Sequence, residues 1–283
     1  MNKLASKDLI NRLLNVGIER AEAKKEVSIL LSEFGETNLS KIEEIINERV
    51  KSRMPIQYLI GKAYFMDLEV RVNKNVLIPR PETEVLVEET INRLLKVQSN
   101  DALKILDIGT GTGVIPIAIC RAMLGVAAIA LDIEEEIIKL GKENSTKYSL
   151  ERRIDFKVCD LFSESIHSLF KENKFDLIIS NPPYIKENKL NNLHPEVSLH
   201  EPKIALSGSK ENKTGLAYYE RIIDLTKQYL SYSPVKNNSF ILALEIDPPL
   251  VNGLKIILQR KGFNNFEITK DYAKLDRCLF VYP

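Results

Sequence analysis

The most informative stretch of the chain is FDLIISNPPY, residues Phe175 to Tyr184. Its apolar run up to Ile179 is typical of a strand that is buried on both faces, as in a parallel sheet. Asn181 and the two prolines after it should end the strand, because a proline has no backbone N–H to donate. The stretch therefore predicts a stiff turn at the carboxyl end of a strand, where open α/β sheets bind their ligands.

This turn carries groups that can hold a planar amino group. The side-chain oxygen of Asn181 and the carbonyl of Pro182 are two acceptors on a rigid frame, and Tyr184 offers a flat ring face. Such an arrangement would orient a weakly nucleophilic nitrogen toward an electrophile, which is catalysis by positioning. Asn and Pro are also common in ordinary turns, so this stretch alone leaves a plain strand-to-loop connection as an alternative.

Strand-like and helix-like runs alternate on both sides of the turn. Repeated strand–helix units build a doubly wound sheet whose strands are mostly parallel. We therefore predict an α/β fold with a seven-stranded, mostly parallel sheet. The expected strands are residues 103–108, 127–131, 154–158, 175–179, 239–246, 266–269 and 278–282.

The first three of these strands end in groups that suit an adenosine. Gly109-Thr110-Gly111-Thr112-Gly113 is a glycine-rich turn that lets the backbone approach a ligand at a helix N-terminus. Its glycines do not have the dinucleotide spacing, and no P-loop lysine follows. Asp132 could accept both ribose hydroxyls, and Asp160 an adenine amino group. Each acid alone is more often a strand-end charge, but their succession predicts an adenosine cofactor with a non-phosphate electrophile.

Residues 1–54 have a different pattern, with apolar residues at the spacing of three short amphipathic helices. We expect a small helical bundle of mixed charge and without catalytic residue types, either a docking module for another protein or a structural cap. Residues 55–75 predict a linking β-hairpin that turns near Asp67. The remaining residues, 76–283, form the expected sheet domain.

Composition limits the classes of function. The 283 residues include 40 basic and 39 acidic side chains, so no strong attraction to nucleic acid is expected. Cys120, Cys159 and Cys278 stand far apart, which argues against disulfides and a zinc site and suits a reducing cytoplasm. The sequence offers neither an apolar signal core nor a run long enough to span a bilayer. We expect a cytoplasmic monomer that uses no metal and no membrane.

Taken in order, the motifs resemble those of class I S-adenosylmethionine-dependent methyltransferases. These motifs are DIGTGTG from Asp107, the acid Asp132, Asp160-Leu161-Phe162, and the Asn-Pro-Pro-Tyr turn. Three further stretches narrow the resemblance to the peptide chain release factor glutamine methyltransferases, over nearly the whole chain. They are PIQYLIG at 55–61, IPRPETE at 78–84 and HEPKIAL at 200–206.

The resemblance implies methyl transfer from S-adenosylmethionine, which leaves S-adenosylhomocysteine, to the side-chain amide of a glutamine. This glutamine belongs to the Gly-Gly-Gln motif of class 1 release factors, and the helical bundle would recognise that protein. Cys159, His200 and Asp247-Pro248 depart from the usual family residues. The implied cofactor-binding residues are Gly109, Thr110, Gly111, Thr112, Gly113, Asp132, Asp160, Leu161 and Asn181. The implied substrate-binding residues are Arg80, Asn181, Pro182, Pro183 and Tyr184, of which Asn181, Pro182 and Tyr184 would be catalytic.

Two other functions stay open at this point. An adenine-N6 or guanine-N2 nucleic-acid methyltransferase would use the same turn, but would usually need a basic surface or an added target-reading domain. A non-catalytic binding protein on the same fold should have lost the glycine turn or the Asn-Pro-Pro-Tyr turn. Both turns are intact.

Overall fold

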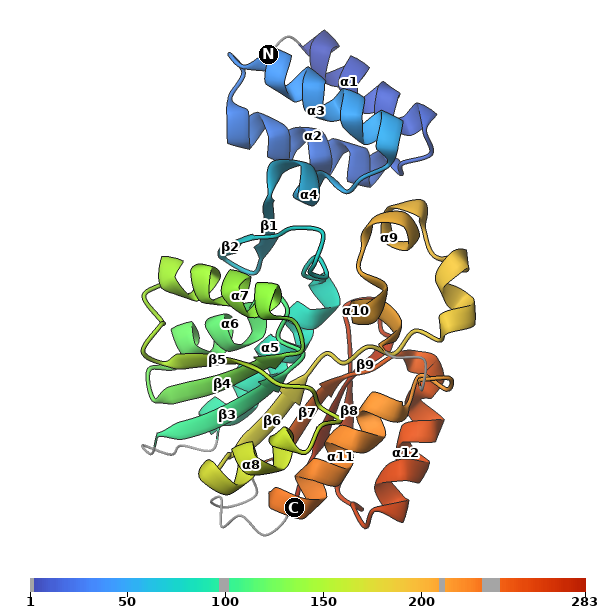
Figure 1. The fold of residues 1–283 in the computed structure, drawn as a ribbon. Helices are drawn as coiled ribbons and strands as arrows, with labels where there is room; N and C mark the ends of the chain where they lie inside the picture. The colour runs from blue at the N-terminus through green and yellow to red at the C-terminus, as the bar shows by residue number, and fades with distance from the viewer. Residues whose placement is uncertain (1–2, 97–101, 209–211, 231–239) are drawn as a thin grey trace. The chain divides into compact units, whose positions relative to one another are not determined.

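The computed structural model describes residues 3–96, 102–208, 212–230 and 240–283 (Figure 1). The chain forms two compact units. The helical unit comprises Met1–Lys62 together with Leu193–His200, and the sheet unit comprises Ala63–Asn192 together with Glu201–Pro283. The chain therefore passes from one unit to the other at residues 62–63, 192–193 and 200–201. No pattern in the sequence indicates that residues 193–200 belong with the N-terminal helices.

The helical unit contains the three amphipathic helices that the sequence predicts. They are α1 (Lys3–Asn15), α2 (Arg20–Phe34) and α3 (Leu39–Ser52), and the short helices α4 (Ile56–Ile60) and α9 (Pro195–His200) complete the unit. Leu13, Leu30 and Ile46 are fully buried where the apolar stripes of the helices meet. Burial of these stripes, rather than helix propensity, stabilises helices of this length.

A buried arginine connects α9 to the N-terminal helices. Arg49 on α3 donates from Nε and Nη2 to the carboxylate of Glu26 on α2, at 2.9–3.2 Å. Its Nη1 donates to Glu196 Oε1 on α9 at 3.1 Å and to the carbonyl oxygen of Arg53 at 3.0 Å. Arg49 thereby links helices whose residues lie up to 147 positions apart in the sequence.

The expected hairpin is formed by β1 (Lys62–Phe65) and β2 (Leu68–Arg71), which pair as a two-stranded sheet. Met66 in the turn has a left-handed φ of 52°, and Asp67 follows it, as predicted. The backbone N–H of Arg71 donates to Asn144 Oδ1 at 2.8 Å, which fixes β2 to the helix α7 (Glu135–Lys147).

The sheet unit is built on a seven-stranded sheet with the order β5-β4-β3-β6-β7-β9-β8. Strand β9 runs antiparallel to both β7 and β8, and the other described pairs are parallel. This confirms the predicted fold class, although Ser239 of the expected fifth strand lies outside the described residues. The strands are β3 (Leu103–Ile108), β4 (Val126–Asp132), β5 (Ile154–Val158), β6 (Leu177–Ser180), β7 (Leu242–Glu245), β8 (Phe266–Lys270) and β9 (Asp276–Val281).

Helices cover both faces of this sheet (Figure 1). Helices α5 (Pro81–Lys96), α6 (Val114–Ala122) and α7 pack on one face. Helices α8 (Ser165–Glu172), α11 (Ala217–Tyr229) and α12 (Val251–Arg260) share a buried cluster with the other face. Short helical turns complete the unit: η1 (Glu187–Asn192), α10 (Lys203–Ser207) and η2 (Pro248–Leu250). No helix in the described ranges is long and apolar enough to cross a membrane.

Strand β3 is the position at which the strand order reverses. It pairs in parallel with β4 on one side and with β6 on the other, so Ile108 lies opposite both Leu131 and Ser180. The turns that follow these three strands therefore start side by side at one edge of the sheet. Ligands of doubly wound folds bind at such a reversal.

Candidate active site

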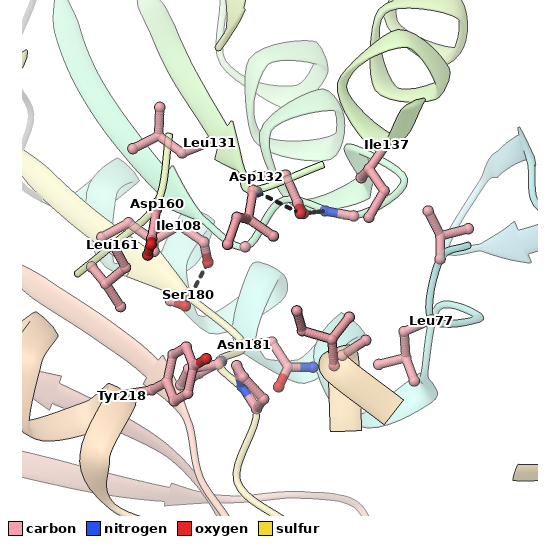
Figure 2. A pocket seen from close by; sticks show the side chains of 18 of the residues that line it. Leu77, Ile108, Leu131, Asp132, Ile137, Asp160, Leu161, Ser180, Asn181 and Tyr218 are labelled. Atoms are coloured by element: carbon pink, nitrogen blue, oxygen red, sulfur yellow. Dashed lines mark hydrogen bonds between the residues drawn. The ribbon is translucent and has the colours of Figure 1, made fainter. Parts of the chain in front are cut away.

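A pocket lies at this edge of the sheet unit, beyond the carboxyl ends of β3, β4, β5 and β6 (Figure 2). Eight of the residues that the sequence analysis assigned to the site line it: Gly109, Gly111, Asp132, Asp160, Leu161, Asn181, Pro182 and Pro183. Five others lie outside this lining: Arg80, Thr110, Thr112, Gly113 and Tyr184. The roles assigned to all of these residues remain predictions.

The glycine turn after β3 needs glycine for two different reasons. Gly109, Gly111 and Gly113 have φ values of 74°, 54° and 82°, which a residue with a side chain rarely adopts. A Cβ added at Gly109 or Gly111 would meet no atom within 4 Å, because both border the open pocket. A Cβ at Gly113 would lie 3.1 Å from the Phe156 ring, so close packing also requires this glycine.

Asp132 is held in place by backbone groups before any ligand binds. Its Oδ2 accepts from the N–H of Gly111 at 3.0 Å and its Oδ1 from the N–H of Ile133 at 2.9 Å (Figure 2). Burial raises the pKa of this carboxyl, and the backbone hydrogen bonds oppose that rise. The carboxylate lines the pocket and keeps lone pairs for a hydroxyl donor.

Asp160 stands on the pocket wall after β5, with Oδ1 accepting from the N–H of Phe162 at 2.9 Å. The ring of Phe162 meets Tyr218 edge to face, with 5.0 Å between centroids. Tyr218, on α11, lines the pocket and was not predicted. No motif in the sequence points to it, because α11 does not come directly after a strand-end motif.

Asp107 is another residue that the sequence analysis did not single out, although it opens the DIGTGTG motif. It is fully buried, and neither of its carboxylate oxygens has a hydrogen-bond partner in the described part of the chain. Burial raises the pKa of Asp107 to about 7. A buried carboxylate without a partner is costly. Asp107 does not line the pocket itself, but the next two residues, Ile108 and Gly109, do.

One end of the Asn181 side-chain amide is hydrogen-bonded within the protein. Its Nδ2 donates to Thr83 Oγ1 at 3.1 Å, and Thr83 Oγ1 donates to Glu245 Oε2 at 2.6 Å. Thr83 and Glu245 are almost completely buried. Neither was predicted as a site residue, although Thr83 belongs to the IPRPETE stretch.

The other half of the Asn-Pro-Pro-Tyr turn is fixed by its surroundings. The carbonyl of Pro183 accepts from Asn212 Nδ2 at 3.1 Å, and the Tyr184 ring packs against the buried cluster beneath α11. Arg80 forms an ion pair with Glu201, which precedes α10. Arg80 therefore secures the segment that brings Ile204 and Ala205 to the pocket wall.

Comparison with known proteins agrees with this geometry. A family model described as a methyltransferase domain matches residues 99–206. A solved structure, the "delta-N METTL16 MTase domain", has the same fold, with a TM-score of 0.54 and 17% identity over 75% of this chain and 87% of that one. Fold and pocket together define an α/β methyltransferase.

Curated relatives identify the family within this class. The release factor glutamine methyltransferase of Thermodesulfovibrio yellowstonii is 36% identical over 240 residues, which cover 85% of this chain and 80% of the relative. That of Clostridium acetobutylicum is 36% identical over 249 residues, or 88% and 82%. The chain belongs to the release factor glutamine methyltransferase family, which confirms the resemblance and makes the protein an enzyme rather than a non-catalytic binder.

Proposed function

We propose that this enzyme methylates the side-chain amide nitrogen of the glutamine in the Gly-Gly-Gln motif of class 1 release factors. Family membership supports the substrate. The observation that carries the chemistry is the Asn181 amide. Its nitrogen donates a hydrogen bond to Thr83, so its oxygen is the end that remains to accept from a substrate N–H. Asn181 lines the same pocket as Gly109 and Gly111 of the glycine turn.

The pocket fits S-adenosylmethionine as the methyl donor. Asp132, already oriented by Gly111 and Ile133, would accept the ribose hydroxyls, and Asp160 with Leu161 would contact the adenine. The unpaired carboxylate of Asp107 would compensate the positive charge at the amino-acid end. When bound, this donor supplies an electrophilic methyl group on a sulfonium.

The protein's contribution to the reaction is mainly orientation. A carboxamide nitrogen is a poor nucleophile because its lone pair is delocalised into the carbonyl. Asn181 Oδ1 and the Pro182 carbonyl would accept its two N–H groups and turn the lone pair toward the methyl. Both hydrogen bonds strengthen as positive charge develops on nitrogen, so they stabilise the transition state more than the ground state. The extra proton then passes to water.

The helical unit would recognise the release factor, since its N-terminal helices carry mixed charge and lie apart from the chemistry in the sequence. Because α9 belongs to this unit, its partner surface would include residues from the loop after the Asn-Pro-Pro-Tyr turn. Release factors act in the cytoplasm, and we place the enzyme there. The alternative, a nucleic-acid methyltransferase, shares the turn but lacks the support of the family relatives.

Labelling of candidate substrates tests this proposal. Purified enzyme is given methyl-labelled S-adenosylmethionine with whole release factor, DNA or RNA. We expect label on the release factor alone, and none on a release factor whose Gly-Gly-Gln glutamine is changed to alanine. Label on nucleic acid, or equal label on the altered release factor, would contradict the proposed substrate.

A further inference from the structure

Three side chains from separate elements form a line that ends at the pocket. Glu245 lies on β7, Thr83 on α5 and Asn181 directly after β6. The Thr83 hydroxyl stands between the other two, 2.6 Å from the Glu245 carboxylate and 3.1 Å from Asn181 Nδ2. Thr83 is 4% exposed and Glu245 1%, so water does not compete for these bonds.

The chemistry of this line determines its direction. A carboxylate can only accept, so the single proton of the Thr83 hydroxyl goes to Glu245. The hydroxyl oxygen then has only lone pairs to offer, and Asn181 must turn its NH₂ toward it. The two ends of an asparagine amide have nearly the same shape, so packing alone distinguishes them poorly. The hydrogen bond does distinguish them.

We infer that Thr83 and Glu245 are positioning residues that fix the Asn181 amide with its oxygen toward the substrate. The inference rests on the proposed role of Asn181 in holding an amino group. With the amide reversed, an NH₂ group would face the substrate NH₂ group. Two donors would then oppose each other and one of the two orienting hydrogen bonds would be lost.

The donors and acceptors along this line can reverse when Glu245 takes up one proton. A neutral carboxyl can donate to Thr83, and the Thr83 hydroxyl can then donate to Asn181, which exposes the wrong end of the amide. Burial raises the pKa of Glu245 to about 7, although the Thr83 hydrogen bond opposes this rise. The other titratable groups that face Glu245 are Arg277, Arg80, Glu82, Tyr184, Tyr219 and Cys278.

Ionised Glu245 therefore corresponds to the competent orientation. We expect kcat to rise with pH through the pKa of Glu245, and to fall as the carboxyl becomes protonated below about 7. Glu245→Gln has no such titration, and its amide can either donate to Thr83 or accept from it. This variant should therefore have a lower kcat and lose the acid limb that Glu245 produces.

Substitutions at Thr83 test the line directly. Thr83→Val keeps the shape and removes the hydroxyl, and should lower kcat about tenfold, the value of one hydrogen bond. Thr83→Ser keeps the hydroxyl and should restore kcat. The affinity for S-adenosylmethionine should change little in either variant, because Thr83 does not line the pocket.

A matched control exists on the same helix. Thr90 on α5 is fully buried, and its hydroxyl has no hydrogen-bond partner in the described part of the chain. Thr90→Val makes the same chemical change without breaking a hydrogen bond. It should leave kcat and its pH profile at the wild-type values.

The experiment measures kcat against pH for the wild type and these four variants, with whichever substrate the wild type labels. Loss in Thr83→Val, recovery in Thr83→Ser and a flattened profile in Glu245→Gln are expected. Wild-type kcat in Thr83→Val, or an unchanged acid limb in Glu245→Gln, would overturn the inference. A wild type that labels nucleic acid instead would refute the proposed substrate, while the variants would still test the positioning.

Discussion

Two buried carboxylates, Glu26 in the helical unit and Glu245 in the sheet unit, differ in how their buried charge is compensated. Glu26 is 4% exposed and faces the guanidinium of Arg49 through three short contacts. Glu245 is 1% exposed, and its hydrogen-bonded neighbour is the neutral hydroxyl of Thr83. Burial raises the pKa of both, and that of Glu245 reaches about 7.

This difference indicates two purposes. The charge of Glu26 is compensated inside the helical unit, and the network serves to hold α9 to α2 and α3. The charge of Glu245 is compensated poorly, and its hydrogen bond leads to Asn181 at the pocket. Weakly compensated buried charge is common at functional sites, where orientation matters more than stability.

The largest effect should come from breaking the compensated network. Arg49→Met leaves Glu26 without its guanidinium and leaves Glu196 with Arg53 as its remaining described cation. The change should lower the free energy of unfolding of the helical unit by about 3–5 kcal/mol. Chemical denaturation measures this loss. Lys41→Met is the control, because the Lys41–Glu44 pair is exposed and its removal should cost about 0.5 kcal/mol or less. Equal losses in the two variants would show that the buried Arg49 network stabilises the helical unit no more than an exposed ion pair does.

The second prediction concerns stability against pH. The pKa of Glu245 in the folded protein, about 7, lies above its ordinary value of 4.5. Its contribution to stability is therefore complete below pH 4.5 and is lost as pH rises through 7, by on the order of 3 kcal/mol.

Glu245→Gln should not show this loss. The free energy of unfolding of the variant relative to the wild type should increase between pH 5 and 8, as followed by urea titrations at each pH. A constant difference would show that Glu245 has an ordinary pKa in the folded protein.

The smallest of these effects concerns the cofactor. Asp132→Ala should weaken S-adenosylmethionine binding by roughly ten- to a hundredfold, or about 1.5–3 kcal/mol, through lost charge-assisted ribose hydrogen bonds. Calorimetry measures it, and NAD and ATP should show no appreciable binding to the wild type. Unchanged affinity in the variant would remove Asp132 from the site.

Features that depend on residues close together in the sequence could be predicted from the sequence. Apolar runs revealed the seven strands, and the groups directly after them identified Gly109, Asp132, Asp160 and Asn181, because parallel strands bring their ends to one edge. It could not reveal contacts that only the fold creates. Asn181 and Thr83 are 98 positions apart, and Thr83 and Glu245 are 162 positions apart.

The same limit applies to the helical unit. The local pattern of residues 193–200 does not show that they pack with the N-terminal helices. Their hydrogen-bond partner Arg49 lies 147 positions before Glu196. The sequence also placed Tyr184 beside the substrate on the strength of its motif. The aromatic ring on the pocket wall is that of Tyr218, and whether Tyr184 contacts a bound substrate stays a prediction.

The turnover of Asn181→Ala on whole release factor tests the central claim most directly. The change removes one of two acceptors for the target nitrogen, while Pro182, Pro183 and Tyr184 keep the turn. We expect kcat to fall on the order of a hundredfold or more, and to fall by a larger factor than the affinity for S-adenosylmethionine. Asn181→Asp retains an acceptor and should lie between the wild type and Asn181→Ala. Wild-type kcat in a folded Asn181→Ala enzyme would contradict catalysis by positioning at this residue.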